Sequence, residues 1–190
     1  MHELSLKLQE FFFEAALATY AGSAPKTSIE GLPKSKVYRY ERDNYMYIDT
    51  YFTNGEQSGG QTIIYIKPEG SPTFVPAWIM QYHGWCKDDD PKVLAFLKEA
   101  LRATYEEGVF HGGRGSVMFP FCGQVRTITN DDYLIYRNDA GRILPCAFHR
   151  FSGEERIYRS HDKHATNGWK EVFWHRYQGM TLLPEVQQEK

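Results

Sequence analysis

The two halves of the chain carry the same residue patterns in the same order. Each pattern is separated from its partner by 85 to 95 residues, and such a recurrence is typical of a duplicated structural unit. The four matched pairs are FFFEAALATY (11–20) with FLKEALRATY (96–105), NYMY (44–47) with DYLI (132–135), SGGQ (58–61) with SGEE (152–155), and WIMQYHG (78–84) with FWHRYQG (173–179). We therefore expect an internal duplication, with repeat one at about 4–86 and repeat two at about 91–182.

Each repeat is expected to begin with an amphipathic helix. Apolar residues recur at the 3.6-residue period over 8–19 in the first repeat and over 93–104 in the second. Pro91 follows three aspartates, which is typical of a helix start, and Gly22 and Gly108 are stop signals. A helix with one apolar face packs that face on another element, so each helix needs a flat partner.

A sheet is the expected partner, because segments rich in Tyr, Ile, Val, Thr and Trp follow each helix. Short turn-forming connections separate these segments and favour antiparallel pairing. The expected strands are 36–41, 45–52, 61–67, 75–83, 124–129, 133–137, 147–151, 155–159 and 171–177. The predicted fold is α+β: a helix plus an antiparallel β-meander, twice, in one pseudo-two-fold domain over 1–190 with a polar tail at 184–190.

Composition and charge exclude several classes of function. The 190 residues have a net charge of −2 and scattered Lys and Arg, so we expect no direct nucleic-acid binding. The chain has no apolar run near the roughly 20 residues of a membrane span and no signal-peptide pattern, which predicts a cytoplasmic protein without a membrane partner. Cys86, Cys122 and Cys146 lack CxxC spacing and are expected to be reduced thiols. Antiparallel edge strands are compatible with a homodimer.

One predicted strand brings three tyrosines and a carboxylate to the same face. Alternation along 45–52 places on this face Tyr45, Tyr47, Asp49 and Tyr51. The opposite face, expected to lie under a helix, carries Met46, Ile48, Thr50 and Phe52. An Asp among aromatic rings can bind a cation or amine, since each ring adds about 0.5–2 kcal/mol of cation–π attraction. The alternative is a solvated strand face on which Asp49 pairs with an arginine.

The last strands of the two repeats supply a second candidate set. The repeat pairs Trp78, Met80 and Tyr82 with Phe173, His175 and Tyr177, and ligand clefts favour interfaces between halves. Core packing is the alternative, but it explains His175 less well because a buried imidazole needs a partner. Arg114, in the glycine-rich turn 112–115, could bind a carboxylate or pair with a surface acid.

The leading hypothesis is a small-molecule-binding, sensor-like domain for an aromatic or cationic ligand. Its expected ligand-binding residues are Tyr47, Asp49, Tyr51, Trp78, Tyr82, Arg114, His149, Glu155, His175 and Tyr177. The alternatives are a hydrolase-like enzyme that uses His149 with Glu154 or Glu155, and a protein-interaction module. No cofactor and no metal site are expected, because the histidines at 149, 161 and 164 lack a ligand motif.

Several of these segments, taken as a set, resemble a known family. They are EAALATYAG (14–22), YMYIDTYF (45–52), PAWIMQYHG (76–84), FSGEERIY (151–158) and YQG (177–179). Over about 11–182 the chain resembles the bacterial domain-of-unknown-function family 5680. Members often follow an XRE-type helix-turn-helix in transcriptional regulators, so the resemblance implies an effector-sensing role. Here the first helix is expected near residue 4, which implies a stand-alone version.

Overall fold

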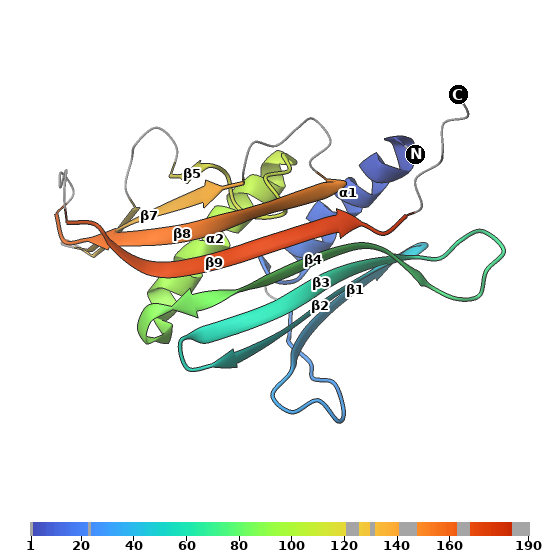
Figure 1. Ribbon diagram of the computed structural model, residues 1–190, viewed down its shortest axis with the longest axis horizontal. Helices are drawn as coiled ribbons and strands as arrows, with labels where there is room; N and C mark the ends of the chain where they lie inside the picture. The colour runs from blue at the N-terminus through green and yellow to red at the C-terminus, as the bar shows by residue number, and fades with distance from the viewer. Residues whose placement is uncertain are drawn as a thin grey trace.

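The computed structural model describes residues 2–22, 24–120, 126–129, 132–140, 148–162 and 168–183. Within them the chain forms two α-helices and a nine-stranded antiparallel sheet (Figure 1). The elements are α1 (His2–Ala18), β1 (Lys36–Arg42), β2 (Tyr45–Asn54), β3 (Gln57–Ile66), β4 (Val75–Cys86), the 3-10 helix η1 (Lys87–Asp89), α2 (Pro91–Glu107), β5 (Met118–Phe119), β6 (Arg126–Thr129), β7 (Asp132–Asp139), β8 (Arg150–Ser160) and β9 (Lys170–Thr181). None of the helices in these residues is long and apolar enough to cross a membrane.

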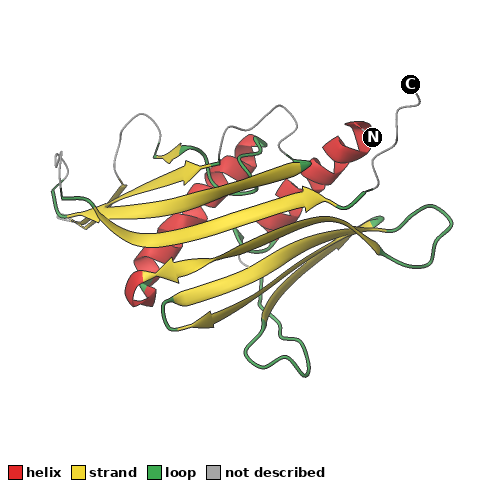
Figure 2. Ribbon diagram, viewed as in Figure 1, coloured by secondary structure: helices red, strands yellow, loops and turns green. Residues whose placement is uncertain are grey.

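The sheet is built from two groups of strands that meet at its centre. The strand order is β1-β2-β3-β4-β9-β8-β7-β5, and β6 also pairs with β7. The central pair is β4 with β9, in a register that sets Trp78 opposite Thr181, Tyr82 opposite Tyr177, and Cys86 opposite Phe173. Both helices cover the same face of this sheet (Figure 2). The α+β class and the antiparallel pairing that the sequence predicts are confirmed.

The residues at both ends of α2 account for where this helix begins and ends. Asp90 caps α2 by accepting a hydrogen bond from the Lys92 backbone N–H at 2.8 Å, and Pro91 occupies the first turn. Gly108 ends the helix in the left-handed conformation, at φ 68°. The apolar stripe of α1 packs into the core, where the ring of Phe12 lies 5.3 Å from that of Trp78.

Strand boundaries differ from the prediction mainly in the second repeat. Of the expected strand 147–151, only Arg150 and Phe151 are in a strand, because Phe148 and His149 form a turn and residue 147 lies outside the described residues. These two residues and the expected strand 155–159 belong to one continuous strand, β8, because the intervening residues keep their ladder with β9. The two-residue strand β5 is too short to leave a pattern in the sequence. Part of the expected strand 124–129, the tail 184–190, Cys122 and Cys146 lie outside the described residues.

The prediction of which face of β2 meets the helices is wrong. Tyr47, Asp49 and Tyr51 are buried beneath the helices, with exposed fractions of 3%, 3% and 8%. Met46, Ile48 and Thr50 are only half-buried on the opposite face, and Phe52 is exposed. The sorting by apolar character fails because the polar atoms of the first set have hydrogen-bonding partners under the helices, and such partners remove much of the cost of burial.

Candidate functional site

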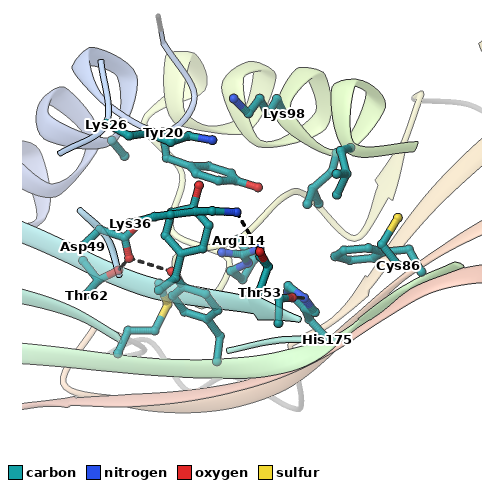
Figure 3. A pocket seen from close by; sticks show the side chains of 18 of the residues that line it. Tyr20, Lys26, Lys36, Asp49, Thr53, Thr62, Cys86, Lys98, Arg114 and His175 are labelled. Atoms are coloured by element: carbon teal, nitrogen blue, oxygen red, sulfur yellow. Dashed lines mark hydrogen bonds between the residues drawn. The ribbon is translucent and has the colours of Figure 1, made fainter. Parts of the chain in front are cut away.

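A cavity of about 300 Å³ lies between the sheet and the two helices. Its apolar walls come from both helices and from the central strands, through Phe12, Ala16, Met80, Leu94, Leu97 and Phe173. Polar and aromatic side chains complete the lining, and Figure 3 shows Lys26, Asp49 and His175 among them. The full polar and aromatic set is Tyr20, Lys26, Lys36, Tyr47, Asp49, Tyr51, Thr53, Glu56, Ser58, Thr62, Tyr82, Cys86, Asp89, Lys98, Tyr105, Arg114 and His175. Apolar walls with a few directed polar groups are typical of small-molecule sites.

The structure brings most of the residues singled out from the sequence into this one place. The lining includes Tyr47, Asp49, Tyr51, Tyr82, Arg114 and His175. Glu155 lies directly behind the lining, in contact with both Arg114 and His175. The remaining members of the predicted set, Trp78, His149 and Tyr177, are not part of the lining.

Trp78 and His149 lie outside the cavity lining and contact other parts of the fold. The indole of Trp78 is fully buried, stacks on the rings of Phe148 and Phe151 at 5.2 and 5.5 Å, and donates Nε1–H to the Phe148 carbonyl at 3.1 Å. His149 is half-buried just before β8, where its backbone carbonyl accepts the N–H of Thr181 at 2.9 Å. Trp78 is therefore a core residue, and the cavity has only one histidine in its lining.

A glycine-rich turn at 112–115 packs against Asn138 of β7 and Tyr177 of β9. Gly112 has a positive φ of 70°, and a Cβ there would lie 2.6 Å from the ring of Tyr177. Asn138 holds the turn by donating from Nδ2 to the carbonyl of Gly115 at 2.7 Å, and its Oδ1 accepts the hydroxyl of Tyr177 at 2.6 Å. The turn presents Arg114, as the sequence predicts, but to the buried interior, where Arg114 forms part of the cavity lining.

Asp49 is the buried carboxyl of the cavity. Its Oδ1 accepts two hydrogen bonds, from the hydroxyl of Tyr82 at 2.7 Å and from that of Thr62 at 2.9 Å. The second oxygen, Oδ2, accepts none from the residues that the structure describes. Burial raises the pKa of the Asp49 carboxyl above its usual range, against the opposing effect of those two hydrogen bonds. The group is thus oriented and retains hydrogen-bonding capacity.

Arg114 and Glu155 form a buried ion pair next to the cavity. The Arg114 Nε–H donates to Glu155 Oε1 at 2.8 Å, Nη2 contacts the same oxygen, and the hydroxyl of Tyr136 donates to Oε2 at 2.8 Å. Burial alone would raise the pKa of Glu155, but Arg114 and His175 outweigh it and lower that pKa to about 2. The carboxylate in turn raises the pKa of Arg114, against the effect of burial. Both groups are therefore charged at neutral pH.

His175 belongs to a row of residues that crosses four adjacent strands. In the sheet register Ser58 of β3 lies opposite Gly84 of β4, Gly84 opposite His175 of β9, and His175 opposite Glu155 of β8. Because Gly84 has no side chain, the imidazole passes over it and its Nε2 lies 2.9 Å from Ser58 Oγ. Its Nδ1 lies 3.5 Å from Glu155 Oε1 without hydrogen-bond geometry. Burial lowers the pKa of His175, so the imidazole is neutral at pH 7.

Three lysines of the lining escape sequence reasoning. Lys26 precedes β1, Lys36 opens β1, and Lys98 lies on α2. In the sequence each resembles an ordinary solvated lysine, since they are separated by up to about 70 residues and share no motif. They come to one cavity because α2 packs against α1, and α1 in turn contacts β1 and β2. Ser58 is missed for the same reason, because its histidine partner comes from the other end of the chain.

No metal centre is formed by the described residues, among which no group of three or more His, Cys, Asp and Glu side chains comes together. His164 lies outside them.

Comparison with known proteins gives no further guide to the function. No family model, curated protein or solved structure matches this chain. The resemblance to family 5680 therefore stays a prediction, and the function is argued from the cavity.

Proposed function

We propose that this protein binds a small molecule in the cavity between its sheet and its helices, as a sensor-like domain. The observation that carries the proposal is Asp49. A buried carboxyl is costly unless its oxygens are hydrogen-bonded, and here both donors reach one oxygen while the other accepts no hydrogen bond from the described residues. Such incompletely paired groups concentrate at functional sites. The cavity volume of about 300 Å³ lies at the lower end of the range for small-molecule pockets.

The substitution Asp49→Asn is expected to abolish or strongly weaken ligand binding without unfolding the protein. The amide keeps the volume of the carboxyl and an oxygen that accepts from Tyr82 and Thr62, but it replaces Oδ2 by an N–H donor. A thermal-shift panel of small aromatic acids, amides, amines and nucleotides measures the effect. Compounds that stabilise the wild-type protein should shift the variant by at most a third as much.

The matched control is Asp43→Asn, the same change in an exposed turn outside the cavity. It should retain the wild-type response to every compound. The proposal fails if no compound stabilises the wild-type protein, or if Asp49→Asn and Asp43→Asn respond to the compounds alike.

The internal duplication and the resemblance to family 5680 are part of the same proposal. The register of β4 with β9 supports the duplication, because Tyr82 and Tyr177, which the repeat equates, lie opposite each other at the centre. Each donates its hydroxyl to a side-chain oxygen two strands away in its own half: Tyr82 to Asp49, and Tyr177 to Asn138. In this interpretation the ligand cavity lies over the strands of the first half, with α2 and β9 of the second half also in its lining, whereas the turn at 111–116 covers Asn138 and Tyr177 of the second half.

Ester hydrolysis is a second candidate function, favoured by the row Ser58–His175–Glu155. The neutral imidazole can accept the Ser58 proton at Nε2 while Oγ attacks an ester carbonyl and forms a tetrahedral adduct. The imidazolium, next to Glu155, then protonates the departing alkoxide as its C–O bond breaks, which leaves an acyl-serine, and water releases the acid by the same route. Binding remains the first proposal, because Arg114 and Tyr136 already share the Glu155 carboxylate.

Hydrolysis of p-nitrophenyl acetate tests this second candidate. If the row acts as base and nucleophile, Ser58→Ala and His175→Gln should each lower the rate by about 100-fold or more. Ser71→Ala, in an exposed loop, serves as the matched control and should retain the full rate. Equal rates for wild type and Ser58→Ala would rule the row out as the source of hydrolysis.

A further inference from the structure

One region of the cavity gathers positive charge around two tyrosine rings. The Nζ atoms of Lys26 and Lys36 lie 5.7 and 5.5 Å from the ring centroid of Tyr51, and that of Lys98 lies 5.2 Å from the centroid of Tyr20. The two rings are themselves 6.4 Å apart. Three ammonium groups from three separate segments therefore converge on one place (Figure 3).

These three ammonium groups have no acidic partner. None of them forms an ion pair with a carboxylate of the described residues, and the hydrogen bond of Lys36 goes to a neutral hydroxyl, Thr53 Oγ1, at 2.7 Å. Burial, together with the nearby charges of Lys26 and Arg102, lowers the pKa of Lys98. Like charges held close together without a counter-ion repel one another and destabilise the folded protein, and a bound anion relieves this repulsion.

The other charges of the cavity do not compensate for the lysines. Arg114 and Glu155 neutralise each other, and the Asp49 carboxyl is held by Tyr82 and Thr62 and forms no ion pair with any of the three lysines. Two further acids, Glu56 and Asp89, border the cavity and are exposed, as is Lys26; neither forms an ion pair with the three lysines, and Glu56 already accepts the backbone N–H of Asp88 at 2.7 Å. A cationic ligand would thus meet ammonium groups at the very rings expected to attract it, because Tyr20 and Tyr51 already face the chain's own lysines.

We propose that the ligand is a small acid whose carboxylate or phosphate binds between Lys26, Lys36 and Lys98, while a hydroxyl or N–H at its other end reaches Asp49. This inference rests on the proposed binding function and, for the aromatic or cationic ligand expected from the sequence, replaces the cation by an anion. Charge-assisted hydrogen bonds from three ammonium groups orient the acid. Asp49 Oδ2 is the acceptor left for the neutral end.

The experiment compares four probes that differ only in one substituent: 4-hydroxybenzoate, 4-hydroxyphenyl phosphate, 4-hydroxybenzamide and 4-hydroxybenzylamine. Titration calorimetry of the wild-type protein at low salt should show one or both acids binding at least tenfold more tightly than the amide, and no measurable binding of the amine. The order of the two acids tells a carboxylate site from a phosphate site. Raising the salt concentration should weaken the binding of the acids and leave the amide unaffected.

Two variants on the same helix separate the cavity from the overall charge. Lys98→Gln should weaken the acid by roughly tenfold, whereas Lys92→Gln, the same change at an exposed position of α2 outside the lining, should leave its affinity unchanged. The inference is overturned if the amide or the amine binds as tightly as the acids, if Lys92→Gln and Lys98→Gln lose equal affinity, or if none of the four probes binds. The proposed function fails separately, when the wider thermal-shift panel gives no stabilising compound.

Discussion

Replacing Arg114 with methionine is expected to destabilise the protein by about 3–5 kcal/mol. The substitution keeps much of the aliphatic volume but leaves Glu155 fully buried without its cation, with hydrogen-bonding support only from Tyr136. The exposed pair of Arg39 with Glu41 provides the comparison, because Arg39→Met should cost only about 0–1 kcal/mol in solvent. Urea unfolding followed by circular dichroism measures both variants.

A double substitution shows whether the cost comes from the unpaired charge. Arg114→Met with Glu155→Gln removes both charges and keeps an acceptor for the Tyr136 hydroxyl, so it should recover part of the stability that Arg114→Met loses. Failure of the double variant to recover stability would mean that the packing of Arg114, rather than its charge, matters.

Acid adds a second readout of the same ion pair. The pKa of Glu155 is lowered from 4.5 to about 2 in the folded protein, so its contribution is fully present above pH 4.5 and is lost as the pH falls from 4.5 towards 2. The double variant should therefore have a flatter decline of stability over this range than the wild-type protein. Parallel declines would contradict the assignment of the low pKa to Glu155.

Local patterns in the sequence were sufficient for both helices and for most of the strands of this fold. The caps of α2 at Asp90 and Gly108, the apolar stripes of both helices and the antiparallel strands follow from periodicity and turn residues within short windows. The buried face of β2 did not follow, because the choice between Tyr47 and Ile48 as the inward residue depends on hydrogen-bond partners from β3 and β4. Apolar character alone favoured Ile48.

The site depends even more on long-range register. Residue types alone placed Glu155 next to the nearby His149, whereas the pairing of β8 with β9 sets it opposite His175. The same holds for Lys36 and Lys98, which line the same cavity only after α2 packs against α1. A sequence names residue types able to bind a ligand, but the sheet register decides which of them meet.

Substituting Gly84 by alanine is expected to destabilise the protein by about 3 kcal/mol, which is large for one added methyl group. A Cβ at this position would lie 1.9 Å from the Trp174 carbonyl oxygen and 2.3 Å from Cδ2 of His175. Gly84 lies on β4, and Trp174 and His175 lie on β9. These two strands form the central pair of the sheet, so the backbone can relieve the overlap only by separating them. The absence of a side chain at Gly84 is thus what lets His175 reach Ser58.

The neighbouring glycine across the strand pair supplies the control for this substitution. A Cβ at Gly59 would meet its nearest atoms at 3.4 Å, in ordinary contact with His83 and Tyr82, so Gly59→Ala should change stability by less than about 1 kcal/mol. Denaturant unfolding of both variants measures the difference. Since Gly59 and Gly84 lie on adjacent strands and the added group is identical, equal effects would contradict the close passage of His175 over Gly84. A large loss confined to Gly84→Ala would support it, and with it the geometry of the row from Ser58 to Glu155.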